Sequence, residues 1–433
     1  MGNKLTKKEN SKRNKIDDLD KAFHDWYRFV LSYPPHLVDA YIEEFGLDQE
    51  SVVFDPFCGT GTTLVEAKLN NIKSVGAEAS PLAHFVSSVK VDWEIDQNRY
   101  FKIAKRIKNN VLEKLEAQDI VDDFPTNADR LNVELKKVSP EKQKWLIKNS
   151  ISPLPLHKAL TLQEEIKKYK KERFYNHLLL AFVNAAVNDF SNLRFGPEVG
   201  VGKVKEDSPV VSPWFREVKK HINDLKSLET PNYANSEVYH FDTRDNMSQI
   251  ENSSIDAIIT SPPYPNEKDY SRTTRLESVL LGFITNRAEL QEFKKALIRS
   301  NTRGVYVKDK DEKWIEDFDS VQDIAKQIEK RRKELNKDSG FEKLYSKVTK
   351  HYFGGMYRHL SSIKPKLKSG AKLAYVVGDQ ASYLQVTIKT GKILAEIAED
   401  IGYIVKDLEL FRTRFATATE EDLREEVLIL EKK

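Results

Sequence analysis

The chain has 433 residues, of which 39% are hydrophobic and 32% are charged, and its formal net charge is only +3. This length exceeds one ordinary core, so we expect two or three domains or one domain with large insertions, and the composition excludes a disordered chain. No run approaches the roughly 18 apolar residues of a membrane helix and the N-terminus lacks a signal-peptide core, so we expect a cytoplasmic protein without a membrane partner.

The predicted elements begin after a basic tail at 1–20, which we expect to be disordered. Apolar residues at helical spacing behind two prolines predict a helix over 35–45. A short apolar run at 52–54 predicts a buried parallel strand, followed by a helix over 62–70 and a second strand over 74–78. A strand, a glycine turn, a helix and a second strand are typical of the start of a doubly wound α/β sheet.

Two polar and largely helical segments then interrupt this pattern. Segment 95–235 is rich in Lys and Glu, is broken by prolines at 153 and 155, and is irregular from Arg194 to Pro213. Segment 285–347 is charged and contains the basic run from Lys330 to Lys333. We interpret that run as a solvated helix face, with contact to DNA as the alternative.

Strand patterns return at 237–241 and 255–260, and the C-terminal part again predicts strands and one helix, over 372–378, 390–402, 403–410 and 425–430. The fold class is therefore α/β, a doubly wound Rossmann-like sheet with two largely helical insertions. We expect the sheet domain to be assembled from three parts of the chain, residues 21–94, 236–284 and 348–433.

The most specific pattern runs from Asp55 to Thr63 and reads Asp-Pro-Phe-Cys-Gly-Thr-Gly-Thr-Thr. The preceding strand delivers Asp55 to a carboxyl edge of the sheet, where open α/β folds bind ligands. Gly59 and Gly61 permit a sharp turn and close approach to a ligand, and the threonines can cap the following helix. Glu78, at the end of the next strand, can accept both hydroxyls of a ribose. A structural glycine turn and a dinucleotide site are the alternatives, but the third glycine of a dinucleotide motif is absent.

A second pattern, Thr-Ser-Pro-Pro-Tyr at 260–264, follows an apolar strand. Its two prolines fix φ and remove two backbone donors, so nearby carbonyls become acceptors, and Tyr264 offers a flat face. Ser261 and the Pro262 carbonyl can accept the N–H groups of an exocyclic amine. The amine lone pair is then directed at a methyl donor held in line with it. The alternative is an ordinary turn, because Pro-Pro is common in loops.

Together the two patterns resemble the S-adenosylmethionine-dependent amino-methyltransferases of DNA. The resemblance implies a methyltransferase sheet with catalytic residues Ser261, Pro262, Pro263 and Tyr264, in which Tyr264 stacks on a base flipped out of the duplex. It also implies that S-adenosylmethionine is bound by Asp55, Pro56, Phe57, Gly59, Thr60, Gly61, Thr62 and Glu78, by Asp242 at the adenine, and by Tyr27 over the methionine end. Aromatic packing is the alternative for Tyr27 and its neighbours His24 and Trp26.

The single cysteine restricts the chemistry. Methylation at carbon 5 of cytosine uses a thiolate, normally on the catalytic loop, whereas Cys58 lies in the glycine turn. An exocyclic nitrogen is therefore the expected acceptor. One cysteine also excludes intramolecular disulfides and cysteine-based zinc sites, and we expect no metal. In the family that the chain resembles, Ser at the position of Ser261 is usual for cytosine-N4 enzymes, so N4 is favoured and adenine-N6 is the alternative.

Contacts to DNA are expected outside these two motifs. Arg272 and Arg275 can hold phosphates, or they can pair with Glu277 and neighbouring groups. Arg194 and Lys203 lie in a loop with an aromatic and an amide, which can face DNA or be structural, and segment 95–235 is the candidate target-recognition region. The C-terminal pair of strands with Arg412 resembles the closing hairpin of these enzymes.

We therefore predict a site-specific DNA methyltransferase of a restriction–modification system, with double-stranded DNA and a cognate restriction endonuclease as expected partners. Most family members with Ser-Pro-Pro-Tyr carry the two motifs in the opposite order. One rival is a tRNA guanine-N2 methyltransferase, although those enzymes usually carry Asp-Pro-Pro-Tyr and a preceding RNA-binding domain. A DNA-binding specificity subunit with a relic fold is another, and the intact Gly59, Ser261 and Tyr264 argue against it.

Overall fold

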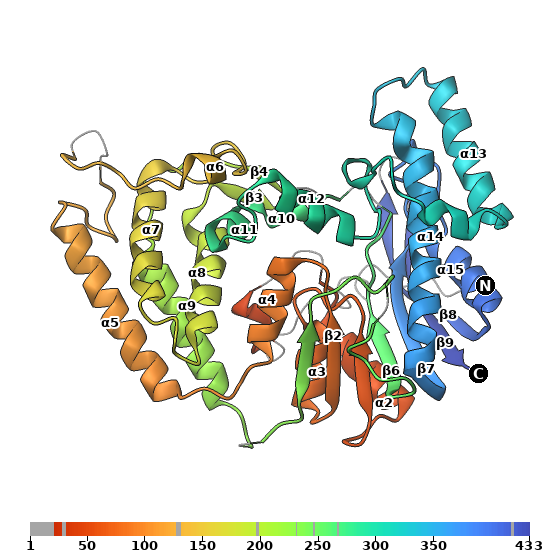
Figure 1. Cartoon of the computed structure of the whole chain (residues 1–433), viewed down its shortest axis with the longest axis horizontal. Helices are drawn as coiled ribbons and strands as arrows, with labels where there is room; N and C mark the ends of the chain where they lie inside the picture. Colours follow the sequence, from red (N-terminus) through yellow and green to blue (C-terminus); the bar gives the residue numbers. More distant parts are fainter. Residues whose placement is uncertain are drawn as a thin grey trace.

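The computed structural model describes residues 21–27, 32–126, 131–195, 199–230, 232–245, 247–265, 268–416 and 420–433, so the predicted tail at 1–20 lies outside it. The described residues form a seven-stranded sheet in the order β5-β2-β1-β6-β7-β9-β8 (Figure 1). Strands β5, β2, β1, β6 and β7 are parallel, whereas β9 pairs antiparallel with both β7 and β8. The predicted doubly wound α/β sheet is confirmed.

Each strand predicted from the sequence is present in this sheet. The strands are β1 (Val52–Asp55), β2 (Lys73–Ala77), β5 (Ser236–Tyr239), β6 (Ile255–Thr260), β7 (Leu367–Gly378), β8 (Tyr403–Ala416) and β9 (Glu421–Lys432). The last three are longer than predicted, because β7 already pairs with β6 at Leu367 and because β8 and β9 pair beyond the apolar residues that mark them in the sequence.

The helices wholly or largely outside the two inserted segments are α2 (Pro35–Phe45), α3 (Thr62–Leu69), α4 (Pro81–Lys90), α10 (Tyr270–Thr273), α11 (Arg275–Leu281), α14 (Tyr345–Ile363) and α15 (Thr390–Ile401), with the short turns η2 (His24–Trp26) and η8 (Lys364–Lys366). Segment 95–235 contains α5 (Gln97–Glu116), α6 (Pro140–Gln143), α7 (Pro153–Lys167), α8 (Tyr175–Ala185), the π-helical η4 (Ala186–Phe190), the hairpin β3 (Leu193–Phe195) and β4 (Val199–Val201), and α9 (Val211–Lys226). Segment 285–347 contains α12 (Arg287–Ala296), η5 (Thr302–Gly304), η6 (Asp311–Ile315), α13 (Asp319–Glu334) and η7 (Glu342–Leu344).

Alternate strand residues supply the two apolar faces of the sheet. Val53 of β1 and Ile259 of β6 pack with α2 and α3 on one face. Phe54 of β1 and Ile258 of β6 pack with α14 and α15 on the other. Burial on both faces explains why these strands read as continuous apolar runs in the sequence.

Two local expectations were only partly right. The prolines at 153 and 155 begin α7 rather than break a helix, because the first helical turn has no partner for its N–H groups. The stretch from Arg194 to Pro213 is less irregular than expected. Among its described residues, β3 and β4 form a hairpin and α9 begins at Val211, whereas residues 202–210 are irregular as predicted.

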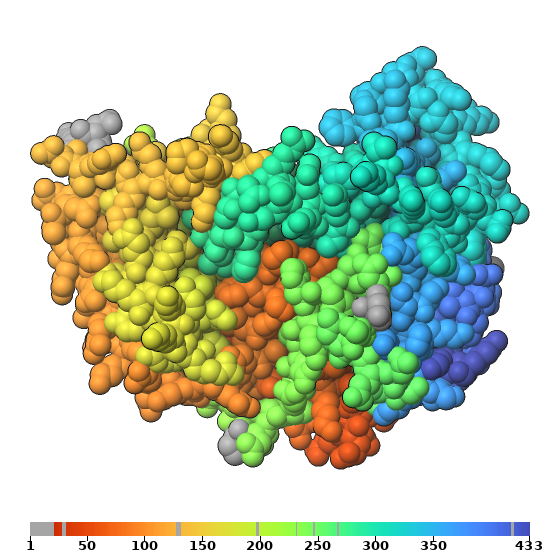
Figure 2. Space-filling view, viewed as in Figure 1, coloured from red at the N-terminus to blue at the C-terminus, as the bar shows by residue number. Residues whose placement is uncertain are grey.

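The helices of segment 95–235 pack against α11, which follows β6 in the chain. Helices α5, α7, α8 and α9 share one apolar cluster with Leu82 and Val86 of α4 and with Leu276 and Leu280 of α11. The Gln163 side-chain amide of α7 also donates to the Leu280 carbonyl at 2.7 Å. In the space-filling view, α11 and α12 form a band between this helical region and the rest of segment 285–347 (Figure 2). Among the described helices, none has the length and apolar character needed to span a bilayer.

Candidate functional site

The two sequence motifs leave the sheet from neighbouring strands. Strands β1 and β6 are paired through Val53 with Ala257 and Phe54 with Ile258, so their carboxyl ends lie side by side. Asp55, at the end of β1, is fully buried. Its carboxylate accepts hydrogen bonds from Thr260 Oγ1 at 2.6 Å and from Thr63 Oγ1 at 2.7 Å. Asp55 therefore ties the glycine turn directly to the first residue of the second motif.

The two glycines of the turn have different roles. Both lie in the left-handed region, with φ of +51° at Gly59 and +86° at Gly61. A Cβ on Gly61 would lie 3.1 Å from the Ser87 Cβ of α4, so this glycine permits close packing. A Cβ on Gly59 would have one described atom within 4 Å, the Phe57 carbonyl oxygen at 3.9 Å. The backbone at Gly59 is therefore open to a ligand.

The threonines do not cap α3 as expected. Among the described residues, Gly61 occupies the N-cap position and no side chain there accepts from the first turn of the helix. The Thr63 hydroxyl instead contacts Asp55 and the Ile259 carbonyl, the latter at 3.0 Å. The Thr63 hydroxyl thus joins β1 to β6. The sequence pattern alone could not distinguish this role from capping of α3.

A cavity of about 320 Å³ lies between the two motifs. The predicted site residues that line it are Tyr27, Pro56, Phe57, Gly59, Thr60, Thr62, Glu78, Asp242, Ser261, Pro262, Pro263 and Tyr264. Asp55 and Gly61 are not lining residues and instead support the wall. The four predicted nucleic-acid contacts, all described in the structure, also lie outside the lining of this cavity: Arg194, Lys203, Arg272 and Arg275.

Glu78 is fixed at the opening of the glycine turn. Its carboxylate accepts from Gly59 N at 2.8 Å and from Ser80 N at 2.7 Å. Burial raises the pKa of Glu78 to about 7. The two backbone donors hold both carboxylate oxygens in place, and each oxygen keeps a further lone pair for a ligand hydroxyl.

In the aromatic stretch at residues 24–27, Tyr27 lines the cavity and Trp26 lies in the core. The Tyr27 hydroxyl donates to Glu277 Oε1 at 2.6 Å, and burial raises the pKa of Glu277 to about 7. Trp26 is fully buried and its ring nitrogen donates to Asp224 at 2.8 Å. Tyr27 lines the cavity, whereas Trp26 packs in the core, so aromatic packing holds for Trp26 and the cofactor contact of Tyr27 stays a prediction.

The second motif holds its tyrosine against β7. The Ser261 hydroxyl donates to the Val376 carbonyl at 3.2 Å. A Cβ on Gly378 would lie 3.1 Å from Tyr264 Cε2, so the absence of a side chain at Gly378 makes room for the ring. Burial raises the pKa of Tyr264 well above its ordinary value, so its phenol stays neutral at physiological pH.

Sequence reasoning missed several cavity residues: Lys268, Tyr270, Leu297, Ile298, Gln380, Phe411, Arg414 and Glu425. Arg412, quoted only as part of a hairpin, also lines the cavity and pairs with Glu425 across β8 and β9. A register shift between Leu410 and Arg412 re-aims this part of β8. The signal available in the sequence was the i, i+2 spacing of Arg412 and Arg414, which places both side chains on one face of a strand.

The predicted DNA contacts are distributed over two other places. Arg275 donates to the Ser271 carbonyl at 2.9 Å, so it holds α10 and does not pair with Glu277. Arg272 is half-buried in α10. Arg194 and Lys203 are exposed at the β3–β4 hairpin. Their contact with nucleic acid stays a prediction.

Comparisons with known proteins agree with this geometry. Residues 3–85 match the sequence model of a family of N6 and N4 methyltransferases described as DNA methylase. The chain is 23% identical over 415 residues to the type II methyltransferase M.BsoBI of Geobacillus stearothermophilus, covering 89% of this chain and 79% of that protein. It is 23% identical over 417 residues to the type II methyltransferase M.AvaI of Nostoc sp., covering 91% and 81%. A third relative, the type II methyltransferase M.MvaI of Kocuria varians, is 21% identical over 69% of this chain and 67% of its own.

Proposed function

We propose, from the match of residues 3–85 to the DNA methylase family and from the 23% identity to two type II methyltransferases, that this chain is an amino-methyltransferase that methylates double-stranded DNA at specific sites as part of a restriction–modification system. The proposed methyl donor is S-adenosylmethionine, and the proposed acceptor is the exocyclic N4 amine of a flipped cytosine. One observation carries the proposal: the glycine turn and the Ser-Pro-Pro-Tyr loop line the same cavity.

The residues of this cavity fit the proposed cofactor, which supplies an electrophilic methyl group when bound. A cavity of about 320 Å³ lies in the size range of small-ligand sites. The Glu78 carboxylate can accept ribose hydroxyls, and the open backbone at Gly59 allows close approach. Asp242 is the proposed adenine partner and Tyr27 the proposed cover of the methionine end. We propose that Asp55 and Gly61 act indirectly, by holding the turn.

The residues of the second motif would prepare the amine for attack. Ser261 and the Pro262 carbonyl are the proposed acceptors for its two N–H groups, which directs the nitrogen lone pair toward the methyl donor. Tyr264 would stack on the flipped base. Alignment of the two reactants then supplies much of the rate. Ser261 favours cytosine N4, and adenine N6 is the alternative acceptor.

Labelled methyl transfer by the purified protein tests this proposal. The protein is incubated with methyl-labelled S-adenosylmethionine and, separately, with unmethylated duplex DNA, tRNA and a carrier protein. We expect label in the DNA alone, and a labelled nucleoside that co-migrates with N4-methylcytosine. Label confined to tRNA or to protein would contradict DNA as the substrate, and N6-methyladenine would contradict the proposed base.

Cofactor affinity is expected to depend on pH through Glu78. Burial raises the pKa of Glu78 to about 7, so the better acceptor, the ionised carboxylate, is populated only as the pH rises through that value. The dissociation constant for S-adenosylhomocysteine, measured by calorimetry, should therefore fall about tenfold between pH 6 and pH 8. Glu78→Gln should bind more weakly at pH 8 and lose the pH dependence. A dependence that persists in this variant would assign it to another group, such as Asp55.

A methyl group on Gly378 is expected to slow turnover. In Gly378→Ala the new Cβ would approach Tyr264 Cε2 to 3.1 Å and Glu425 Cγ to 3.2 Å, so the ring has to move by a few tenths of an ångström. We expect the rate constant of methyl transfer, measured in single-turnover assays, to fall about tenfold, because small displacements of reacting groups are costly. Gly340→Ala is the control, since the structure describes no atom within 4 Å of a Cβ there. Equal rates in both variants would contradict the proposed role of the ring.

A further inference from the structure

We infer that segment 285–347 is part of the cofactor site, and that its Asp311 is a positioning residue that holds Asp242 through Arg244. This inference rests on the proposed cofactor and adds to it. Asp242 lines the cavity, whereas Asp311 is far from it in sequence and belongs to a segment whose composition suggests only a solvated insertion.

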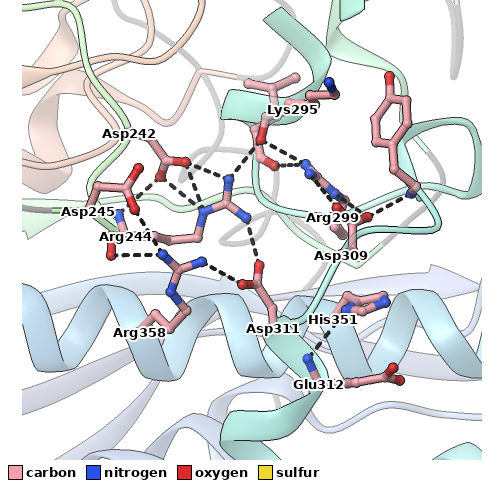
Figure 3. A network of polar contacts seen from close by, with 12 residues as sticks. Asp242, Arg244, Asp245, Lys295, Arg299, Asp309, Asp311, Glu312, His351 and Arg358 are labelled. Atoms are coloured by element: carbon pink, nitrogen blue, oxygen red, sulfur yellow. Dashed lines mark hydrogen bonds and ion pairs between the residues drawn. The ribbon is translucent and has the colours of Figure 1, made fainter. Parts of the chain in front are cut away.

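Arg244 links the two acids directly, as Figure 3 shows. Its guanidinium contacts the Asp242 carboxylate through Nη2 at 2.5 Å and through Nε at 3.0 Å. Its remaining nitrogen, Nη1, donates to Asp311 Oδ2 at 2.7 Å. The geometry fixes the direction of the Asp242 carboxylate, because a guanidinium presents its donors in a rigid plane.

The negative charge of Asp311 is shared by two arginines of this network. Its second oxygen accepts from Arg358 Nη1 of α14 at 2.6 Å, so one carboxylate bridges two arginines. Arg244 and Asp311 are each only 6% exposed. Removing the Asp311 charge would leave Arg244 buried with one acid instead of two. Arg244 would then be free to shift, and the Asp242 carboxylate with it.

The backbone around Asp311 has no space in which to relax. A Cβ on Gly354 of α14 would lie 1.9 Å from the Asp311 carbonyl oxygen, so η6 rests directly on the helix backbone. The neighbouring Gly355 has the Arg244 side chain next to it, with 3.6 Å between a Cβ there and Arg244 Cδ. Segment 285–347 is therefore seated on α14 at this point.

The same segment also supplies apolar wall to the cavity. Ala296, Leu297 and Ile298 line it together with Asp242. Arg244 Nη2 donates to the Lys295 carbonyl at 2.9 Å, which fixes the end of α12 to the network. An adenine ring requires an apolar surface and an acceptor for its exocyclic amine. This wall offers both, and both depend on Arg244.

Binding of adenosine and of S-adenosylhomocysteine, measured by calorimetry on the full chain, tests the inference. In Asp311→Asn we expect the dissociation constants of both ligands to rise by the same factor, about tenfold, because the loss falls on the shared adenine end. Asp245→Asn is the matched control. It makes the same chemical change in another acid that pairs with Arg358. The Asp245 side chain is 69% exposed, and its carboxylate does not contact Arg244. This control should bind like the wild type.

A second variant keeps the test independent of folding. Leu297 is half-buried and lines the cavity, so Leu297→Ala should remain folded and still weaken adenosine binding several-fold. If Asp311→Asn and Leu297→Ala, folded by circular dichroism, bind both ligands as tightly as Asp245→Asn does, the inference is wrong while the proposed function stands. If the wild type binds neither ligand, the proposed function fails and the inference fails with it.

Discussion

Replacement of Tyr264 by alanine is expected to lower kcat by about 10²- to 10³-fold, because the flipped base would lose the ring that holds its amine in line with the methyl donor. The ring lies in the cavity against Gly378, next to Glu425, and we propose that it contacts the flipped base and not the cofactor. The dissociation constant for S-adenosylhomocysteine should therefore change by less than about threefold, a difference below 1 kcal/mol. Steady-state turnover on duplex DNA and calorimetry on the same preparations measure the two quantities.

Tyr264→Phe is the matched control for this variant. It keeps the flat ring and removes only the hydroxyl, whose raised pKa makes it unsuited to act as a base at neutral pH. We expect Tyr264→Phe to retain most of the wild-type kcat. Alanine and phenylalanine variants with equal activity would contradict stacking. A loss of cofactor affinity in Tyr264→Ala would show that the ring contacts the cofactor instead.

Asp55→Ala is expected to produce the largest loss of stability. The buried carboxylate accepts from Thr260, Thr63 and the Phe57 backbone, and alanine would leave the Thr260 hydroxyl and the Phe57 N–H without this acceptor, while Thr63 keeps the Ile259 carbonyl. Each unsatisfied buried group costs about 1–3 kcal/mol, so the free energy of unfolding should fall by about 3–5 kcal/mol. Because both motifs depend on this carboxylate, cofactor binding and turnover should fall together. Chemical denaturation followed by circular dichroism measures the change.

Asp256→Ala tests whether burial is the cause. Asp256 also joins β1 to β6, since it accepts from Val52 N at 2.9 Å, but its side chain is 26% exposed and water can replace it. We expect this variant to lose less than about 1 kcal/mol and to retain activity. Asp55→Asn should be intermediate, because the amide keeps one acceptor oxygen. Equal losses for Asp55→Ala and Asp256→Ala would contradict the role of Asp55 as a buried link between the motifs.

Most of the sheet could be predicted from the sequence, because its strands are buried on both faces and read as short apolar runs. Val52 to Phe54 and Ile255 to Ile259 are clear examples. Their adjacency could be expected from the two motifs they carry, since both motifs need one ligand site. The ends of β8 and β9 could not be predicted, because their pairing continues through polar residues.

The roles of individual site residues were only partly predictable. The sequence placed Gly59, Glu78 and Tyr264 at ligand-binding positions, and all three line the cavity. It could not distinguish Gly61, which allows packing against Ser87, from Gly59, which is open to the cavity. Nor could it show that the Thr63 hydroxyl bonds across strands, because such contacts depend on which strand lies beside β1.

The parts of the cavity wall that distant segments contribute could not be predicted from the sequence. Leu297 and Ile298 come from a segment that reads as charged and solvated, and they reach the cavity because Arg244 and Asp311 fasten that segment to the sheet. The i, i+2 spacing of Arg412 and Arg414 indicates a shared strand face, but the register shift that aims this face at the cavity leaves no pattern in the chain. These contacts are tertiary, and no local spacing encodes them.

The central claim is that the cavity joins a methyl donor to the amine of a base in DNA. Mass analysis of nucleosides from plasmid DNA, isolated from cells that express either the wild type or Tyr264→Ala, tests it most directly. The account predicts N4-methylcytosine in the wild-type sample and its loss in the variant sample. N6-methyladenine in its place would contradict the proposed base, and unmodified DNA alongside methylated tRNA would contradict DNA as the substrate.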